Sequence, residues 1–146
     1  MAATKKRQER QEEIRRIVRT GEIRTQHDLA DRLRDAGFTC TQATVSRDMT
    51  ELGLTKESGE GYILAEDLHL RRMVTELVLS VVHTNNLVLV KASPGSAQGV
   101  AAALDGADIE GILGSIAGDD TVLVIMADEE SARTLESHVS TYMEQK

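Results

Sequence analysis

Small polar side chains and a single cation share one face of the segment 41–52. At about 100° per residue of α-helix, this face collects residues whose short side chains allow close approach to a surface. An arginine there can donate to the O6 and N7 acceptors of guanine or to a phosphate, and hydroxyls can bind base edges or the DNA backbone. The face therefore predicts a helix that enters the major groove of DNA through Ala43, Thr44, Ser46, Arg47 and Thr50.

A second candidate site consists of oxygen-bearing side chains in the distal half. Gln98 and Asp105 are seven residues apart, so on one helix they share a face about 10 Å apart along the axis. Asp119 and Asp120 add two carboxylates at a turn. With no Lys or Arg expected nearby, this group favours a cation, and a guanidinium binds carboxylates through paired hydrogen bonds. Gln98 or the amides after residues 94–95 could bind the carboxylate of a cationic amino acid.

Two other interpretations of these four residues stay open on spacing alone. Gly-Asp-Asp is favourable turn chemistry, and Asp105 could be a solvated helix residue. A hard cation is a third option, but the oxygen ligands are few and lack EF-hand spacing.

The sequence gives little support for catalysis or a resident metal. The four histidines, at positions 27, 69, 83 and 138, lack metal-ligand spacing, and the single cysteine, Cys40, rules out the usual structural zinc cages. No Walker loop, dinucleotide fingerprint or nucleophile elbow occurs. We therefore predict neither an enzyme nor a metalloprotein.

The elements expected to carry the first face are three helices and a hairpin. Apolar periodicity predicts helices over 5–20, from a Thr25 cap to Gly37, and from a Thr41 cap to 52, followed by a hairpin over 55–64. This order is a winged helix-turn-helix, although plain structural domains share it. The basic residues 5–7 oppose the helix dipole, so a frayed first turn is expected, and Glu57 and Glu60 should weaken wing contacts with phosphates.

The distal half predicts strand, strand, helix, strand, strand, helix. Apolar β-branched runs over 77–82 and 87–90 flank an Asn-Asn turn, and a second pair over 112–117 and 121–126 flanks Gly-Asp-Asp. Helices are expected over 96–104 and 129–143. The fold class is thus α+β, with a winged-helix domain at 1–66, a linker at 67–72 and a two-layer α/β sandwich (ββαββα) at 73–146. The second sheet face, or an edge, is left for other subunits.

Charge divides the chain of 146 residues at the same place. Residues 1–60 hold 12 Lys and Arg against 11 Asp and Glu, a net of +1, whereas residues 61–146 hold 5 against 13, a net of −8. Nucleic acid should therefore contact the first half only. No apolar run approaches the roughly 18 residues that span a bilayer, and we expect a cytoplasmic protein. Units this small are marginal alone, which favours a homo-oligomer.

Three segments resemble the bacterial arginine repressor family: residues 41–49 (TQATVSRDM), 93–98 (SPGSAQ) and 111–121 (GILGSIAGDDT). The likeness covers nearly the whole chain. It implies that Ser46 and Arg47 contact operator DNA, with Gln42 and Thr44 nearby. It also implies that L-arginine acts as corepressor in a hexamer of two stacked trimers, held between the trimers by Gln98, Asp105, Asp119 and Asp120.

The resemblance has two departures. Ser115 stands where the family commonly has Thr, and the wing is more acidic than usual, which puts its DNA contacts in doubt. The expected function is repression of arginine biosynthesis genes, with activation of arginine catabolism as a further role. A regulator sensing another cationic amino acid, or an accessory architectural protein in recombination, remain as alternatives.

Overall fold

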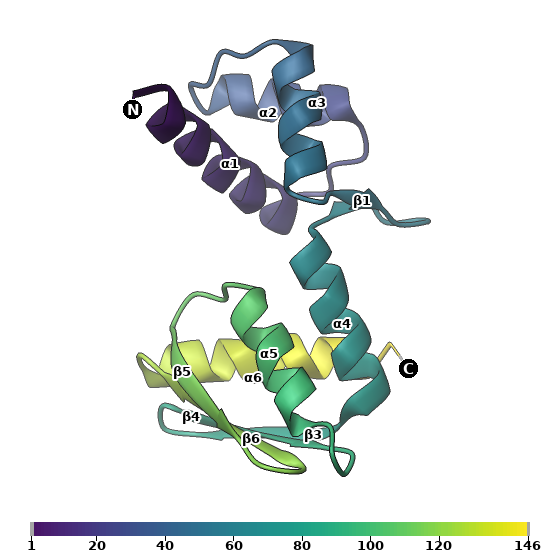
Figure 1. Cartoon of the computed structure of the whole chain (residues 1–146), viewed down its shortest axis with the longest axis vertical. Helices are drawn as coiled ribbons and strands as arrows, with labels where there is room; N and C mark the ends of the chain where they lie inside the picture. The colour runs from purple at the N-terminus through teal and green to yellow at the C-terminus, as the bar shows by residue number, and fades with distance from the viewer. Residues whose placement is uncertain (1, 146) are drawn as a thin grey trace. The chain divides into compact units, whose positions relative to one another are not determined.

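The computed structural model describes residues 2–145, and the chain divides into two compact units between Ala65 and Glu66 (Figure 1). The first unit consists of α1 (Ala2–Thr20), α2 (Gln26–Asp35), α3 (Gln42–Glu51), β1 (Thr55–Lys56) and β2 (Tyr62–Ile63). The second follows α4 (Ala65–Leu77) with β3 (Val78–Thr84), β4 (Leu87–Ala92), α5 (Ala97–Gly106), β5 (Ile112–Ala117), β6 (Thr121–Met126) and α6 (Glu129–Met143). The predicted α+β class, with its helical first unit and ββαββα second unit, is confirmed.

Two threonine caps begin α2 and α3 of the first unit as predicted. Thr25 Oγ1 accepts a hydrogen bond from the Asp28 amide at 3.0 Å, and Thr41 Oγ1 accepts one from the Thr44 amide at 3.2 Å. Each cap satisfies an amide that has no partner inside its helix. The apolar sides of the three helices then form one core, whose fully buried members include Ile14, Leu29, Leu33 and Val45.

The basic residues 5–7 are helical, contrary to the expected fraying of the first turn. Helix α1 begins at Ala2, so residues 5–7 lie inside it. Lys5 Nζ lies 3.9 Å from the Glu9 carboxylate one turn later, and Arg7 binds Glu51 of α3. These carboxylates offset the unfavourable position of the basic side chains near the helix start.

The β1–β2 hairpin is attached to the connection between α1 and α2. The Tyr62 amide donates to the Ile23 carbonyl at 2.8 Å, immediately beside Gly61. A Cβ at Gly61 would lie 2.4 Å from that carbonyl oxygen. Only glycine therefore permits this close approach of backbone to backbone.

Residues 67–72, predicted as a linker, lie inside helix α4. This stretch contains no Pro or Gly that would interrupt a helix, and its apolar residues are buried. Leu70 and Val74 pack in the core of the second unit, whereas Leu64, directly before the helix, packs in the core of the first. The chain segment that connects the two cores is therefore helical from Ala65 onward.

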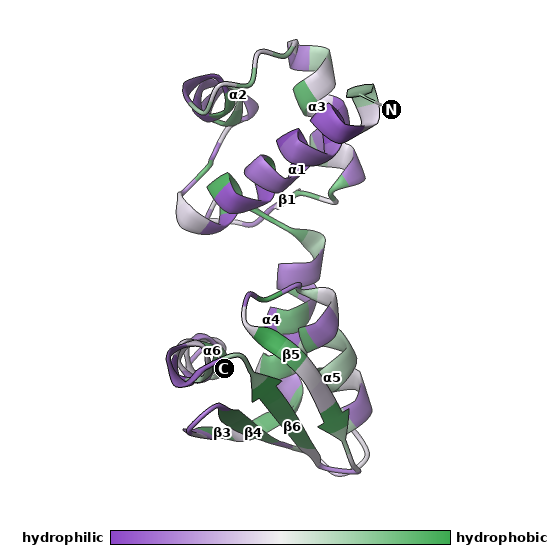
Figure 2. Cartoon of the chain, turned by 90° about the vertical axis from the view of Figure 1, so that its left-hand side faces the viewer, coloured by the Kyte–Doolittle hydropathy of each residue, from purple (hydrophilic) through white to green (hydrophobic). Residues whose placement is uncertain are grey.

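The second unit is an antiparallel sheet with strand order β3-β4-β6-β5 and helices on one face (Figure 1). Alternate residues of the central strands, such as Val88, Val90, Val122 and Val124, are fully buried in the core with residues of α5 and α6. The predicted Asn-Asn turn joins β3 to β4, with Asn85 at a φ of 50°. Figure 2 shows that β4 and β6 are coloured mostly hydrophobic, whereas α1 is coloured mostly hydrophilic.

The opposite sheet face carries exposed apolar side chains. Strand register aligns one residue from each strand in a single row: Val82, Leu89, Leu123 and Ile116. Val82 is 52% exposed and Ile116 68% exposed. We call these four residues the outer-face row.

Candidate functional site

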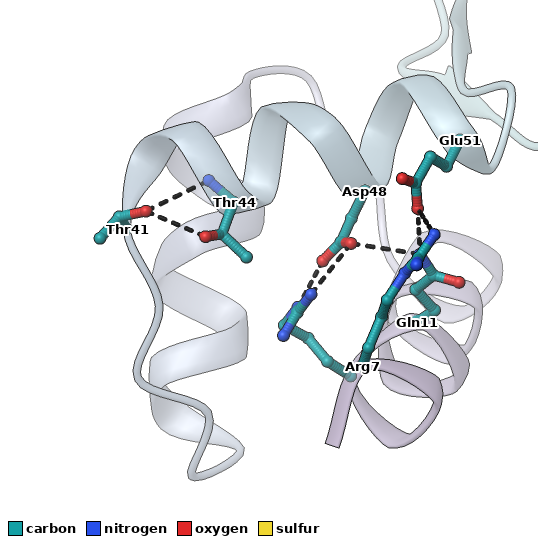
Figure 3. Close-up of polar contacts among 7 residues, drawn as sticks. Arg7, Gln11, Thr41, Thr44, Asp48 and Glu51 are labelled. Carbon is teal, nitrogen blue, oxygen red and sulfur yellow. Dashed lines mark hydrogen bonds and ion pairs between the residues drawn. The ribbon is translucent and has the colours of Figure 1, made fainter. Parts of the chain in front are cut away.

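Helix α3 exposes most of the residues predicted to contact DNA. Gln42, Ala43, Ser46, Arg47 and Thr50 are all exposed, while Thr44 is half-buried. Thr41 and Thr44 place their hydroxyl oxygens 3.0 Å apart within the helix cap (Figure 3). The Thr50 hydroxyl donates to the Ser46 carbonyl at 3.1 Å. Ser46 and Arg47 therefore form the centre of the exposed polar face. The hydroxyls of Thr44 and Thr50 already form hydrogen bonds within the helix and its cap.

Helix α3 is joined to α2 at the start of both helices. The Gln26 side-chain amide, at the start of α2, donates to the Gln42 carbonyl at the start of α3 at 3.3 Å. On its other side α3 buries Val45 and Met49 against the core of the first unit. Burial of this side leaves the side with Ser46 and Arg47 outward, as the sequence periodicity predicts.

Asp48, which was not among the predicted site residues, lies on the buried side of α3. Its side chain is only 2% exposed, and it is the one charged residue in the buried class among residues 2–145. The Arg10 guanidinium of α1 donates to it through two nitrogens, with Nη2 to Oδ1 at 3.1 Å, and Gln11 Nε2 donates to Oδ1 at 3.2 Å (Figure 3). The sequence does contain a signal for this buried ion pair. A carboxylate one turn after Val45 falls within the apolar stripe of the helix, and a buried carboxylate needs a partner.

A second carboxylate of α3 extends this contact. Glu51, one turn after Asp48, accepts hydrogen bonds from Arg7 Nη2 and from Gln11 Nε2, the latter at 2.8 Å (Figure 3). We call Arg7, Arg10, Gln11, Asp48 and Glu51 the α1–α3 polar cluster. Its two guanidiniums are each paired with a carboxylate.

The polar cluster shifts the pKa values of its members. Burial raises the pKa of Asp48, but the hydrogen bonds from Arg10 and Gln11, with the charge of Arg10, bring it below the ordinary value of 3.8. The hydrogen bonds from Arg7 and Gln11 likewise lower the pKa of Glu51. The Asp48 hydrogen bond raises the pKa of Arg10. Both carboxylates are therefore ionised at neutral pH.

In the second unit, the start of α5 is joined to the β5–β6 turn. The Ala97 amide donates to the Asp119 carbonyl at 3.1 Å, and Gln98 Nε2 donates to the Ala117 carbonyl at 3.0 Å. These bonds bring Gln98 beside the turn that holds Asp119 and Asp120. The Ser96 amide donates to the Ser93 carbonyl at 3.1 Å, so the amides of Ser96 and Ala97 both have partners inside the chain.

Asp105 lies at the other end of α5, beside the middle of the edge strand β5. Ser115 Oγ donates to Asp105 Oδ1 at 3.4 Å, a long hydrogen bond. Gln98, Asp105 and Asp119 are exposed and Asp120 is half-exposed. Two of the four predicted residues thus lie on α5 and two in the turn after β5. Asp105 is separated from the other three by the length of the helix.

The expectation of no cation near these carboxylates is wrong. Lys91 of β4 pairs in register with Thr121 of β6, so Lys91 Nζ donates to Thr121 Oγ1 at 2.7 Å and lies 3.8 Å from Asp120 Oδ1. Thr121 Oγ1 also donates to Asp120 Oδ1 at 2.8 Å. The Thr121 hydroxyl and the Lys91 charge both lower the pKa of Asp120. Sequence distance hid this lysine, because strand pairing across the sheet brings it to the turn.

Two further properties of the described chain bear on its class. Over residues 2–145, no group of three or more His, Cys, Asp or Glu side chains is arranged to hold a metal ion. In the same residues no helix has the length and apolar character needed to cross a bilayer.

Comparison with known proteins covers both units. Residues 5–70 match the family model "Arginine repressor, DNA binding domain", and residues 74–141 match "Arginine repressor, C-terminal domain". The arginine repressor of Thermus thermophilus is 45% identical over 139 residues, 88% of this chain and 85% of the relative. That of Carboxydothermus hydrogenoformans is 44% identical over 132 residues, 83% and 88% of the two chains. That of Alkaliphilus oremlandii is 38% identical over 144 residues, 92% and 97%.

A winged-helix unit followed by an acidic sheet-and-helix unit defines a two-domain transcriptional regulator that binds DNA, and not an enzyme. Both family models match in this order, and relatives near 45% identity extend over most of the chain. The chain therefore belongs to the arginine repressor family, which confirms the resemblance in the three sequence segments.

Proposed function

We propose that L-arginine is the corepressor of this regulator and binds at the α5–turn site, defined as Gln98, Asp105, Asp119 and Asp120. The observation that carries the proposal is the bond between the Ala97 amide and the Asp119 carbonyl, which sets Gln98 beside two carboxylates. The turn carboxylates would bind the guanidinium, because they can accept its paired donors. Gln98 would donate to the carboxylate of the amino acid, and Asp105, the length of α5 away, would accept from a second guanidinium at the subunit interface.

On the DNA side, we propose that α3 is the recognition helix. Arg47 is exposed beside Ser46, and its fork of donors matches the two acceptors of a guanine edge. Gln42, Ala43, Thr44 and Thr50 would lie along the same groove, where the small residues allow close approach. The wing carries Glu57 and Glu60, which would contribute little to phosphate binding. The DNA-contacting domain would span 1–66 and the arginine-binding domain 73–146.

Self-association is the third part of the proposal. The outer-face row presents contiguous apolar surface, which folded monomers rarely leave in contact with water. A second copy of the chain is the occupant we propose, in a homo-hexamer of two trimers as the family resemblance implies. Acidic α5–turn sites of neighbouring subunits would repel one another until a cation lies between them. L-arginine would then stabilise the assembly by binding it preferentially.

We place this protein in the cytoplasm. There, a rising concentration of L-arginine would favour the hexamer. The hexamer would bind operators of arginine biosynthesis genes through pairs of α3 helices. The half-sites of such operators should repeat with the helical turn of DNA.

The test is selection of duplexes from a random-sequence DNA library by the full chain, with and without L-arginine, followed by mass measurement of the selected complex. We expect enrichment of a defined sequence only with L-arginine, and a complex of six chains. L-lysine and L-ornithine serve as matched cations and should not replace it. Equal enrichment with either would overturn the corepressor assignment. Failure to enrich any sequence in all arms would overturn the proposed function.

A further inference from the structure

The buried carboxylate of α3 has no direct part in the proposed DNA contacts, yet it lies next to the residue that makes them. Asp48 follows Arg47 in the sequence, so their side chains leave α3 about 100° apart. Whatever fixes the direction of Asp48 also fixes the direction of Arg47. The packing of Val45 and Met49 restrains this direction less, because apolar contact is non-directional.

Hydrogen bonds to Asp48 are directional and come from another helix. Arg10 donates through two nitrogens and Gln11 through its amide, so the carboxylate is held in position and in plane. A carboxylate roughly 5 Å from the helix axis moves by about 2 Å when the helix turns by about 20°. That displacement exceeds the range of hydrogen-bond lengths, so the bonds resist it.

Glu51 adds a second attachment one turn further along. It accepts from Arg7 and from the same Gln11 that donates to Asp48, so α1 contacts α3 at two successive turns (Figure 3). Two attachments on one helix face restrain its tilt as well as its rotation. Both come from long side chains of α1, which lies outside the helix-turn-helix formed by α2 and α3.

We propose that Asp48 is a positioning residue for DNA recognition: through Arg10 and Gln11 it fixes the rotation of α3, so that Ser46 and Arg47 meet the base edges in one register. The inference rests on the proposed recognition role of α3. It assigns sequence preference, and not overall affinity, to the α1–α3 polar cluster. Loss of the cluster should therefore reduce discrimination between duplexes while phosphate binding persists.

The experiment compares the affinity of each variant for a duplex selected by the wild-type chain and for a scrambled duplex of equal length, at saturating L-arginine. Asp48→Asn should lower the ratio of the two affinities by about tenfold, mainly through weaker binding of the selected duplex. The matched control is Glu13→Gln, which removes the same charge from α1 but frees Arg16, a partner within the same helix. The control should keep the wild-type ratio.

A second variant separates positioning from stability. Arg10→Met combined with Asp48→Leu replaces the ion pair with apolar side chains and leaves the net charge unchanged, an exchange that folded proteins often tolerate. We expect a folded protein, checked by circular dichroism, with the same loss of discrimination. A wild-type ratio in this folded double variant, or in Asp48→Asn, would overturn the inference. If the wild-type chain itself shows no preference between the duplexes, the proposed function fails instead.

Discussion

Arg47 is the single exposed cation of α3 and its proposed base-reading residue. Arg47→Ala should reduce the affinity for the selected duplex by about tenfold to a hundredfold, because a bidentate contact to guanine is lost. Binding to scrambled duplex should change little, and the oligomer should stay intact. Mobility-shift titration and light scattering measure the two properties. Arg24→Ala removes the same charge from an exposed site outside α3 and serves as control. Unchanged discrimination in Arg47→Ala would exclude α3 as the recognition helix.

Asp120 is the carboxylate whose surroundings the structure defines best, through Thr121 and Lys91. Asp120→Asn should weaken L-arginine binding by roughly tenfold or more, because a hydrogen bond to a charged group becomes a neutral one. Binding to DNA without L-arginine should persist. Isothermal calorimetry measures the first effect, with Glu110→Gln as an exposed control of equal charge change. Wild-type affinity in Asp120→Asn would place the ligand elsewhere.

The lowered pKa of Asp48 predicts an acid-dependent stability of the first unit. The unfolded chain binds this proton more tightly than the folded chain, so the contribution of Asp48 is complete above the ordinary carboxyl pKa. It is lost as pH falls through the lowered folded pKa. Urea unfolding at about pH 6 and about pH 3 should show a smaller loss of stability on acidification in Asp48→Asn than in wild type. An equal loss in both would contradict the pKa assignment.

At the scale of elements, the hairpin of β1 and β2 depends on its contact with the α1–α2 connection. Gly61→Ala places a Cβ 2.4 Å from the Ile23 carbonyl oxygen, so the hairpin must move or its bond from Tyr62 must break. We expect a loss of about 1–3 kcal/mol in the free energy of unfolding. Gly106→Ala, where a Cβ meets nothing within 4 Å, is the control. Thermal denaturation compares them, and equal midpoints would show that the hairpin adjusts freely.

The elements that could be predicted from the sequence are those set by local signals. The Thr25 and Thr41 caps and the turn at Asn85 depend only on neighbouring residues, and all three form as expected. Contacts between distant segments could not be predicted in this way. The pairing of Lys91 with Thr121 needs the strand register, and the bonds from Arg10 to Asp48 need the packing of α1 against α3.

The helix over the predicted linker was missed for a different reason. Residues 67–72 fall between the two predicted units, and only two of them, Leu68 and Leu70, are apolar. The buried Leu70 and Val74 show that α4 has its own packed face, supplied by the second core. Tertiary burial therefore decides the structure of this segment more than its local polarity does.

At the scale of the whole molecule, the proposed function couples two sites on different units. Linkage requires DNA to tighten L-arginine binding by the same factor by which L-arginine tightens DNA binding, roughly 5- to 150-fold for typical allosteric proteins. Calorimetric titration of L-arginine into the protein, alone and with the selected duplex, measures this factor. The same titration with scrambled duplex is the control. Identical L-arginine affinity in the free and operator-bound states would rule out coupling between the units.

The ammonium group of Lys91 already neutralises part of the charge that the proposed ligand would meet at Asp120. A guanidinium arriving at the turn has to compete with this resident cation, which is tethered and therefore always present. The concentration of free amino acid that half-fills the proposed site would be raised by this competition. The proposed regulator would then need more L-arginine to respond than one whose Asp120 had no neighbouring cation.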